Sequence, residues 1–398
     1  MRENRALVQS KVRISIWYTK LLLIVDSDLA SVVGDGIPSR QRIEDSAEED
    51  NAAKSRKGGR HMKLTTFLTA TTAAALIAGA ASAQTHLRIQ THYATEHPSG
   101  KLAAQFVDDV QTMSGGEITI EMFYSSSVVA SVETFDAAVN GILDCDMTGG
   151  GYQTGKNPAF QFVGDIMGGY DTPYQQLSWL YYGGGYDAAQ ALYNSEGMQL
   201  VGWWIYGQES FASSRPIAGP EDLKGWKFRS PPGLETEIFT AMGATPIVMD
   251  FTEIFTALET GIIDGADASG LSNNVGLGLY DIVKHANYPG FHSMPSDHLA
   301  CNKAVWDGMS EKERRIMDTA MQKLSLHTAL SNEKKNTEAA AMLKTQGVTL
   351  YDWSAEDKAA FRNTAQQSWD KFAEGSPQAV ALVESHRAYL KQLGLISE

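Results

Sequence analysis

The sequence predicts an α/β protein of two similar lobes, because one short pattern occurs twice and the same order of elements surrounds both copies. The segments Glu133–Asp144 (ETFDAAVNGILD) and Glu253–Asp264 (EIFTALETGIID) begin 120 residues apart and are identical at six of twelve positions. Each has the apolar spacing of a short helix that stops at a glycine, Gly141 or Gly261, the residue expected where φ becomes positive beyond a helix. Two such lobes leave a cleft between them, and clefts are where small molecules bind.

The first lobe is expected to begin with a strand–helix–strand unit. Leu87–Tyr93 alternates as a strand does, and apolar residues then recur at helical spacing from Leu102 to Met113. Ile118–Tyr124 alternates again, and the first repeat segment supplies a second helix followed by a strand at Leu143–Thr148. This β-α-β-α-β order favours parallel strands joined by helices.

The second lobe is expected to begin near Gln208 with the same order of elements. After the aromatic-rich residues 165–206, the predicted elements are a strand at Trp226–Ser230, a helix at Leu234–Met242, a strand at Pro246–Phe251, the second repeat helix, and a strand at Ile262–Asp267. The agreement in order between the two halves supports the repeat. No low-complexity linker separates the halves, so crossing strands are expected to join the lobes.

The C-terminal third is predicted to be largely helical. Met309–Lys344 contains neither Gly nor Pro, and a helix of that length would extend roughly 50 Å, enough to brace both lobes. Two amphipathic helices follow at Ala355–Glu374 and Gln378–Leu393. We therefore expect lobe I to comprise residues 84–207 and 298–350, lobe II to comprise residues 208–297, and residues 351–398 to form helices that pack on the lobes.

The N-terminal residues predict export. A charged start at Met62-Lys63, an apolar stretch at Leu64–Ala80 and an A-x-A site at Ala81–Ala83 are typical of a secretory signal peptide over residues 62–83, with Gln84 as the first mature residue. Residues 1–61 are then expected to be a disordered upstream extension from a wrongly assigned start codon. The alternatives are an Ala-rich core helix and a cytoplasmic extension of an anchored protein. Export predicts a periplasmic location.

Charge and cysteine content narrow the class of protein further. Residues 84–398 contain 21 Lys and Arg against 38 Asp and Glu, a net charge of about −17. This argues against nucleic acid or anionic membrane as a partner. Cys145 and Cys301 are too few for a disulfide framework or a metal cluster. They fall on predicted strands that the two-lobe topology could place side by side, and they could pair in an oxidising compartment. We nevertheless expect free, buried thiols, because a bridge requires Cα atoms within about 7 Å and suitable Cβ directions.

At this point the chain resembles a known family, the solute-binding proteins of tripartite ATP-independent periplasmic (TRAP) transporters. The segments that carry the resemblance are Asp222–Arg229 (DLKGWKFR), Met242–Pro246 (MGATP), Glu253–Asp264 and Asn302–Trp306 (NKAVW). Gly149–Pro158 and Tyr181–Gly185 resemble the subgroup that takes up 2-oxo acids, lactate and other organic acids. The resemblance implies a small organic anion bound between the lobes and handed to membrane permease subunits, and a chain that is a monomer or homodimer.

Arg229 is the leading candidate for binding the anion. It ends a predicted strand just before Pro231-Pro232, and the carboxyl ends of such strands are where ligands bind. A guanidinium fork matches a carboxylate with two parallel hydrogen bonds. The resemblance implies the same role for Arg229. The structural alternative is an ordinary ion pair.

The resemblance also implies a cation site at Gln208 and Asp267. In the organic-acid subgroup these positions ligate a cation that bridges to the substrate, and oxygen ligands suit Na⁺ or Ca²⁺. This chain has Asp267, Ala268 and Ser293 where the subgroup has Glu, Trp and Glu. The loss of carboxylate weakens the site, so no cofactor is expected beyond a possible Na⁺ or Ca²⁺. Asp267 could instead bind a ligand hydroxyl or cation directly, or cap a turn.

Four aromatic residues complete the predicted site. By resemblance, Tyr152 contacts the substrate carboxylate, while Trp204, Phe291 and His292 lie near the expected hinge or cleft. A phenol can donate to a carboxylate while its ring walls a pocket. For each of these residues the alternative is simple core packing.

Two other functions are weighed against solute binding. Gly150–Lys156 fits the G-x-x-x-x-G-K phosphate-loop pattern, but Asn157 and Pro158 follow where Ser or Thr should bind Mg²⁺. Catalytic signatures such as G-x-S-x-G and H-E-x-x-H are missing from the sequence. We therefore expect a binding protein and not an enzyme; the alternatives are a periplasmic enzyme acting on a similar acid in the same cleft, and a ligand-loaded partner of a signalling receptor.

Overall fold

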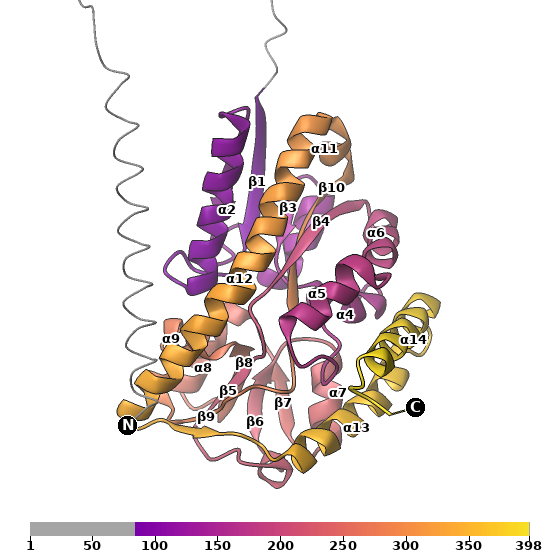
Figure 1. The fold of residues 1–398 in the computed structure, drawn as a ribbon. Coiled ribbons are helices and arrows are strands. Elements are labelled where there is room, and N and C mark those ends of the chain that lie inside the picture. The colour runs from indigo at the N-terminus through magenta and orange to yellow at the C-terminus, as the bar shows by residue number, and fades with distance from the viewer. Residues whose placement is uncertain (1–83, 398) are drawn as a thin grey trace, which may run out of the picture. The chain divides into compact units, whose positions relative to one another are not determined.

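The computed structural model describes residues 84–397. The extension predicted for residues 1–61 and the signal peptide predicted for 62–83 lie outside this range. None of the helices in residues 84–397 combines the length and apolar character that crossing a membrane requires. Two β-sheets, flanked by helices, make up this part of the chain (Figure 1).

The first sheet has five strands in the order β2-β1-β3-β10-β4. The central strand β1 runs parallel to β2 and β3, while β10 is antiparallel to both β3 and β4. The strand bounds are β1 Thr85–Thr91, β2 Ile118–Phe123, β3 Cys145–Met147, β4 Met198–Ile205 and β10 Ser296–Asn302.

The second sheet has six strands in the order β11-β9-β5-β8-β6-β7. Strand β6 runs parallel to β7 and β8, whereas β5 is antiparallel to β8 and β9. The strand bounds are β5 Ser210–Ser213, β6 Lys227–Ser230, β7 Thr245–Val248, β8 Gly265–Ser269, β9 His285–Asn287 and β11 Thr349–Tyr351.

The repeat seen in the sequence corresponds to a repeated β-α-β-α-β unit, so the predicted two-lobe α/β fold is confirmed. In each unit the first strand lies between the other two, giving β2-β1-β3 in one sheet and β7-β6-β8 in the other. Gly141 and Gly261 follow the second helices with φ values of +75° and +70°, which suit glycine. The helices of the units are α2 Pro98–Ser114, α3 Thr134–Val139, α7 Leu234–Ala241 and α8 Ile254–Glu259, with single 3₁₀ turns at Ser131–Glu133 and Phe251–Glu253 before α3 and α8.

Two short segments cross between the sheets. Residues 206–209 connect β4 to β5, and residues 288–295 connect β9 to β10. The lobes are therefore joined by short segments that pass from a strand of one sheet to a strand of the other. This agrees with the crossing connections that the lack of a linker predicted. Both crossing segments border the space between the sheets.

The long predicted helix is present as α12, Glu311–Thr345, and it braces both sheets (Figure 1). It packs on β4 and α2 of the first lobe, and on α9 and the edge strand β11 of the second lobe. A capping box begins the helix. The Ser310 side chain accepts a hydrogen bond from the Glu313 backbone N–H, and the Glu313 side chain accepts one from the Ser310 backbone N–H. Such capping fixes where the helix starts.

The remaining helices cover the lobes. Helix α13, Ala355–Ala373, packs against α7, and α14, Pro377–Gln392, packs against α4, so the C-terminal helices contact both lobes. The other helices are α4 Ala159–Gly164, α5 Pro173–Tyr182, α6 Gly185–Ser195, α9 Leu271–Gly276, α10 Leu279–Ile282 and α11 Lys303–Gly308, with 3₁₀ turns at Gly150–Gln153 and Pro220–Leu223.

The cysteines are not the free thiols that we expected. Cys145 of β3 and Cys301 of β10 form a disulfide, and they are direct partners in the antiparallel pairing of these strands. The expectation was wrong because the two residues are 156 positions apart, and only the strand order of the folded sheet makes them neighbours.

Candidate functional site

A cleft between the two sheets contains the candidate site. The empty space in it measures about 630 Å³, part of which is open to solvent. The first lobe contributes His92, the Gly149–Tyr152 turn and parts of α4, and the second contributes Arg229, the Pro231-Pro232 turn, Glu235, Phe251 and Ala268. The crossing segments add Tyr206, Glu209, Ser293 and Pro295, and strand β10 adds Ser296 and Asp297. A ligand here would touch both lobes and the segments that connect them.

Arg229 lies near the C-terminal end of β6, where the Pro-Pro turn breaks the strand. Its side chain is buried, with 3% of the residue exposed. Nη1 donates to the backbone oxygen of Asp267 at 2.8 Å, and Nε donates to that of Met249 at 3.3 Å. Because a guanidinium has five N–H groups, these bonds orient the side chain and leave other donors for a ligand.

Aromatic and imidazole rings surround Arg229. The guanidinium carbon is 5.9 Å from the ring centre of Phe251, and His92 lies edge-on to both Phe251 and Tyr152. Burial, together with His97 and Arg229, lowers the pKa of His92 to about 3, so this imidazole is neutral. Burial raises the pKa of Tyr152, although Arg229 opposes the shift. The phenol therefore remains a hydrogen-bond donor beside the guanidinium.

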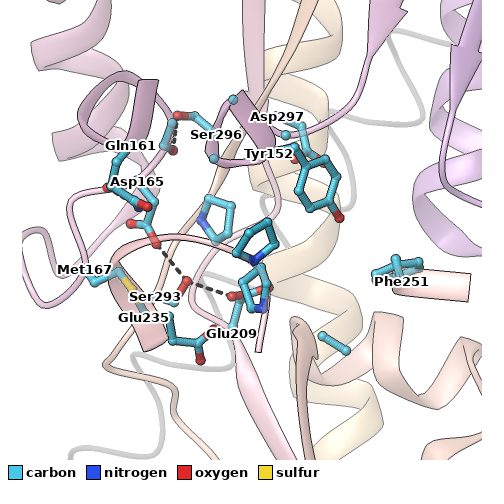
Figure 2. Close-up of a pocket in the computed structure, with 18 of the residues that line it drawn as sticks. Tyr152, Gln161, Asp165, Met167, Glu209, Glu235, Phe251, Ser293, Ser296 and Asp297 are labelled. Carbon is cyan, nitrogen blue, oxygen red and sulfur yellow. Dashed lines mark hydrogen bonds between the residues drawn. The ribbon is translucent and has the colours of Figure 1, made fainter. Parts of the chain in front are cut away.

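Carboxyl groups gather on another side of the cleft (Figure 2). Ser293 Oγ lies 2.7 Å from both Asp165 Oδ2 and Glu209 Oε2. A hydroxyl has a single proton to donate, so one of these two carboxyls must itself be protonated for both contacts to be hydrogen bonds. Burial raises the pKa of Asp165 to about 7, and burial together with Asp267 raises that of Glu209 well above its ordinary value.

Glu235 extends this group of carboxyls from the first turn of α7. It is 2% exposed; Oε2 lies 2.8 Å from Ser230 Oγ, while Oε1 has no hydrogen-bond partner. Burial and the nearby Asp267 raise the pKa of Glu235 well above its ordinary value. We refer to Asp165, Glu209 and Glu235, which all line the cleft, as the carboxyl cluster.

Asp267 and His292 lie behind the carboxyl cluster. Asp267 Oδ1 is 3.2 Å from His292 Nε2, but neither Asp267 oxygen completes a hydrogen bond of normal geometry. Burial alone would raise the pKa of Asp267, but His292, Glu235 and Glu209 hold it below its ordinary value. Asp267 is thus the carboxylate of this region that keeps its charge, and it favours the protonated forms of Glu209 and Glu235.

A further carboxyl, Asp297, lies on the first-lobe side of the cleft. Tyr93 donates its hydroxyl to Asp297 Oδ2 at 2.7 Å, and burial raises the pKa of Asp297 to about 7. The backbone of Gly149 passes close by, since a Cβ on that glycine would lie 3.3 Å from Asp297 Oδ1. The glycine-rich turn that resembles a phosphate loop is therefore packed against a carboxyl group, which is no place for phosphate.

Comparison with known proteins assigns this arrangement to a family. The model of bacterial extracellular solute-binding protein family 7 matches residues 89–376. The chain belongs to this family. The resemblance to TRAP solute-binding proteins is thereby confirmed, and the chain is a binding protein and not an enzyme.

Individual members of the family give the same assignment. A periplasmic protein of a Nostoc species named as binding monocarboxylate 2-oxoacids is 29% identical over 298 residues, covering 71% of this chain and 78% of its own. A TRAP periplasmic solute-binding protein from Rhodobacter sphaeroides, solved in an apo open form, is 35% identical and covers 79% of this chain and all of its own, with a TM-score of 0.64. A TRAP periplasmic solute-binding protein from Pseudoalteromonas atlantica, solved with bound sodium and pyruvate, is 22% identical. It covers 78% of this chain and 95% of its own, with a TM-score of 0.72.

The residues proposed from the family resemblance do not all reach the cleft. Arg229 and Tyr152 line it, whereas Gln208 donates its amide to the Tyr170 backbone at 2.8 Å and lies outside. Trp204 is fully buried against Tyr93. The other two aromatic residues pack elsewhere: Phe291 against Trp353, and His292 against Phe211 and Asp267.

Sequence reasoning missed the carboxyl cluster. Glu209 is one residue beyond the predicted Gln208, and the signal for it was present, because neighbouring residues of an extended segment point to opposite sides. Glu235 follows the Pro-Pro-Gly break in the first turn of a helix, which is also a recognisable position. Asp165 follows α4 without any local pattern that would single it out.

The residues that could hold a metal do not match a Na⁺ or Ca²⁺ site well. Glu209, Asp267 and His292 each place a potential ligand atom within 4.8 Å of the others. Ca²⁺ requires six to eight oxygen ligands, whereas this set contains an imidazole whose Nε2 already faces Asp267. The predicted ligand Gln208 is turned away. We therefore assign no metal a role in binding.

Proposed function

We propose that this chain is the periplasmic receptor of a TRAP transporter, that it binds a small organic acid in the cleft, and that it delivers the acid to membrane permease subunits. Arg229 is the observation that carries the proposal. It is the single Lys or Arg among the described residues that line the cleft, and backbone oxygens of Asp267 and Met249 hold it in place. A carboxylate bound there would gain charge-assisted hydrogen bonds away from bulk water.

Closure of the lobes would couple binding to delivery. Contacts already link the two lobes across the cleft: Gln161 Oε1 accepts from the Leu234 backbone at 3.0 Å, and Asp250 accepts from the backbone and hydroxyl of Ser131 at 3.0 and 3.1 Å. A ligand that touches both lobes favours this closed arrangement over an open one. We propose the crossing segments 206–209 and 288–295 as the hinge.

Thermal-shift screening of the purified full chain against small carboxylates tests the function. Pyruvate, lactate, malonate, succinate and short amino acids form the panel, and each compound that raises the melting temperature is then titrated by calorimetry. We expect saturable binding of at least one carboxylate, and NMR of the mixture should show that the compound is unchanged. A panel in which no carboxylate raises the melting temperature would contradict the proposal.

A further inference from the structure

The ionisable groups that line the cleft are more numerous than an ordinary organic acid would use. One permanent cation, Arg229, faces four carboxyl groups, those of Asp297 and of the carboxyl cluster Asp165, Glu209 and Glu235. His92 adds no charge, because burial holds its pKa near 3. Burial favours the neutral forms of these carboxyl groups in the ligand-free cleft, and a ligand carboxylate at Arg229 would leave all four without a partner of opposite charge.

The guanidinium of Arg229 and the carboxyl cluster occupy different sides of the cleft. Figure 2 shows Asp165, Glu209, Glu235 and Ser293 gathered on one side, with Tyr152 and Phe251 on the other. Arg229 belongs with the latter two, since its guanidinium lies 5.9 Å from the ring centre of Phe251 and acts on the pKa of Tyr152. The cleft therefore has a cationic end and a carboxyl end.

The carboxyl end has a buried carboxyl oxygen without a hydrogen-bond partner. Glu235 is 2% exposed, and its Oε1 lacks a partner although it lines the cleft. Ser230 Oγ is within 3.0 Å of the Pro231 backbone oxygen as well as 2.8 Å from Glu235 Oε2. The single hydroxyl proton of Ser230 can form a hydrogen bond with only one of these two oxygens. Leaving a buried acceptor unpaired is unfavourable, so a ligand N–H at Glu235 Oε1 would satisfy it.

We propose that the ligand is zwitterionic: Arg229 binds its carboxylate, and the carboxyl cluster binds a protonated amine at the other end of the same molecule. The proposal rests on the proposed function, because Arg229 must bind a carboxylate. An ammonium group has three donors and no acceptor, which suits a set of carboxyl oxygens centred on Glu235 and Glu209. Its positive charge is also the partner that the carboxyl groups lack, and an acid without an amine would not supply it.

Three matched pairs of probes test the proposal: L-alanine with L-lactate, 4-aminobutyrate with 4-hydroxybutyrate, and 5-aminovalerate with 5-hydroxyvalerate. Within each pair the skeleton and the carboxylate are shared, and a hydroxyl replaces the ammonium. Calorimetry on the full chain should show, at one of these lengths, an amino acid that binds at least about 10-fold more tightly than its hydroxy partner, since close buried charge pairs are strongly coupled. Hydroxy acids that bind as tightly as, or more tightly than, their amino partners would overturn the proposal and leave the proposed function standing.

The Glu235→Gln variant separates a binding role from a structural one. It keeps the shape and the contact with Ser230 but cannot form an ion pair with an ammonium group, so the affinity for the amino acid should fall about 10-fold or more while that for the hydroxy acid changes little. Glu313→Gln is the matched control, because Glu313 is a buried carboxylate that caps α12 outside the cleft. Equal losses for both probes in Glu235→Gln would overturn the proposal.

An inorganic cation at the carboxyl cluster is the competing outcome. If the hydroxy acid reaches the affinity of its amino partner only when Na⁺ or Ca²⁺ is added, and loses it with chelator, the cation is a metal ion and the proposal is overturned. If no probe and no carboxylate of the wider panel binds, the proposed function fails and the zwitterion proposal fails with it. Failure of the zwitterion proposal alone is distinguishable from failure of the proposed function, because amine-free acids bind in the first case and not in the second.

Discussion

Arg229 Nη1 donates a 2.8 Å hydrogen bond to the backbone oxygen of Asp267, so a single residue of β8 serves both ends of the cleft. The carbonyl of Asp267 orients the guanidinium, while its carboxylate raises the pKa of Glu209 and Glu235. Strands β6 and β8 are parallel neighbours, and Arg229 pairs in register with Ala266, the residue before Asp267. The sheet pairing itself therefore sets the spacing between Arg229 and Asp267.

Replacing Arg229 should abolish tight ligand binding. Removal of one partner of a buried charged pair costs about 2–5 kcal/mol, which is roughly 30-fold to several-thousand-fold in affinity. Arg229→Lys keeps the charge but loses the planar fork and its simultaneous bonds to two backbone oxygens, so it should also bind poorly. Titration calorimetry with the best carboxylate of the panel measures the loss.

A matched control distinguishes this effect from a general loss of structure. Arg215→Ala removes an arginine that bonds the Lys224 backbone outside the cleft, and its affinity should match that of the unaltered protein. Circular dichroism should show that all three variants are folded. Native-like affinity in folded Arg229→Ala would remove the basis for a carboxylate ligand.

Chelation should have little effect on ligand affinity. The predicted ligand Gln208 is turned towards Tyr170, and Ser293 supplies no charge where the organic-acid subgroup has a carboxylate. We expect dissociation constants measured with and without EDTA, and in sodium or potassium buffers, to agree within about 2-fold, less than a 1.4 kcal/mol step. Restoration of affinity by Ca²⁺ after EDTA treatment would show instead that Glu209 and Asp267 bind a metal.

The disulfide should stabilise the first sheet. Cys145 and Cys301 join β3 to β10, and loss of a native disulfide typically costs about 2–5 kcal/mol. The Cys145→Ala/Cys301→Ala double variant should therefore unfold at lower denaturant concentration with its binding site intact. Mass spectrometry after alkylation of the denatured, unreduced protein should find no labelled thiol; two labels per chain would contradict the pairing.

The fold was predictable because its evidence is local, whereas much of the site depends on tertiary geometry. A helix that ends at Gly141 or Gly261 and is followed by a strand can be recognised within twelve residues, and finding it twice predicted both lobes. Arg229 was predictable because it ends a strand before a Pro-Pro turn. Glu209 and Asp165 meet only at Ser293, and Cys145 meets Cys301 only through the order of strands in the sheet. Such contacts between distant residues leave no local pattern.

The ligand-free protein should lose stability as the pH rises from about 5 to 8. Burial raises the pKa of Asp165 and of Asp297 to about 7, whereas the unfolded chain ionises these carboxyls near pH 4. Between those values the folded state binds more protons than the unfolded state, so the free energy of unfolding falls as the pH rises. Each such carboxyl contributes at most about 1.4 kcal/mol per pH unit. The stability is fully present below pH 4 and is lost as the pH passes through 7.

Asp165→Asn tests this dependence, because the amide cannot ionise and can still hydrogen-bond to Ser293. Urea unfolding at pH 5, 6, 7 and 8 should give a shallower decline for Asp165→Asn than for the unaltered protein. Glu253→Gln, which changes an exposed carboxyl, should leave the decline unchanged. If Asp165→Asn and the unaltered protein show the same dependence, Asp165 does not bind a proton on folding. Glu209 would then have to be the protonated carboxyl that allows Ser293 to form hydrogen bonds with both of its carboxyl neighbours.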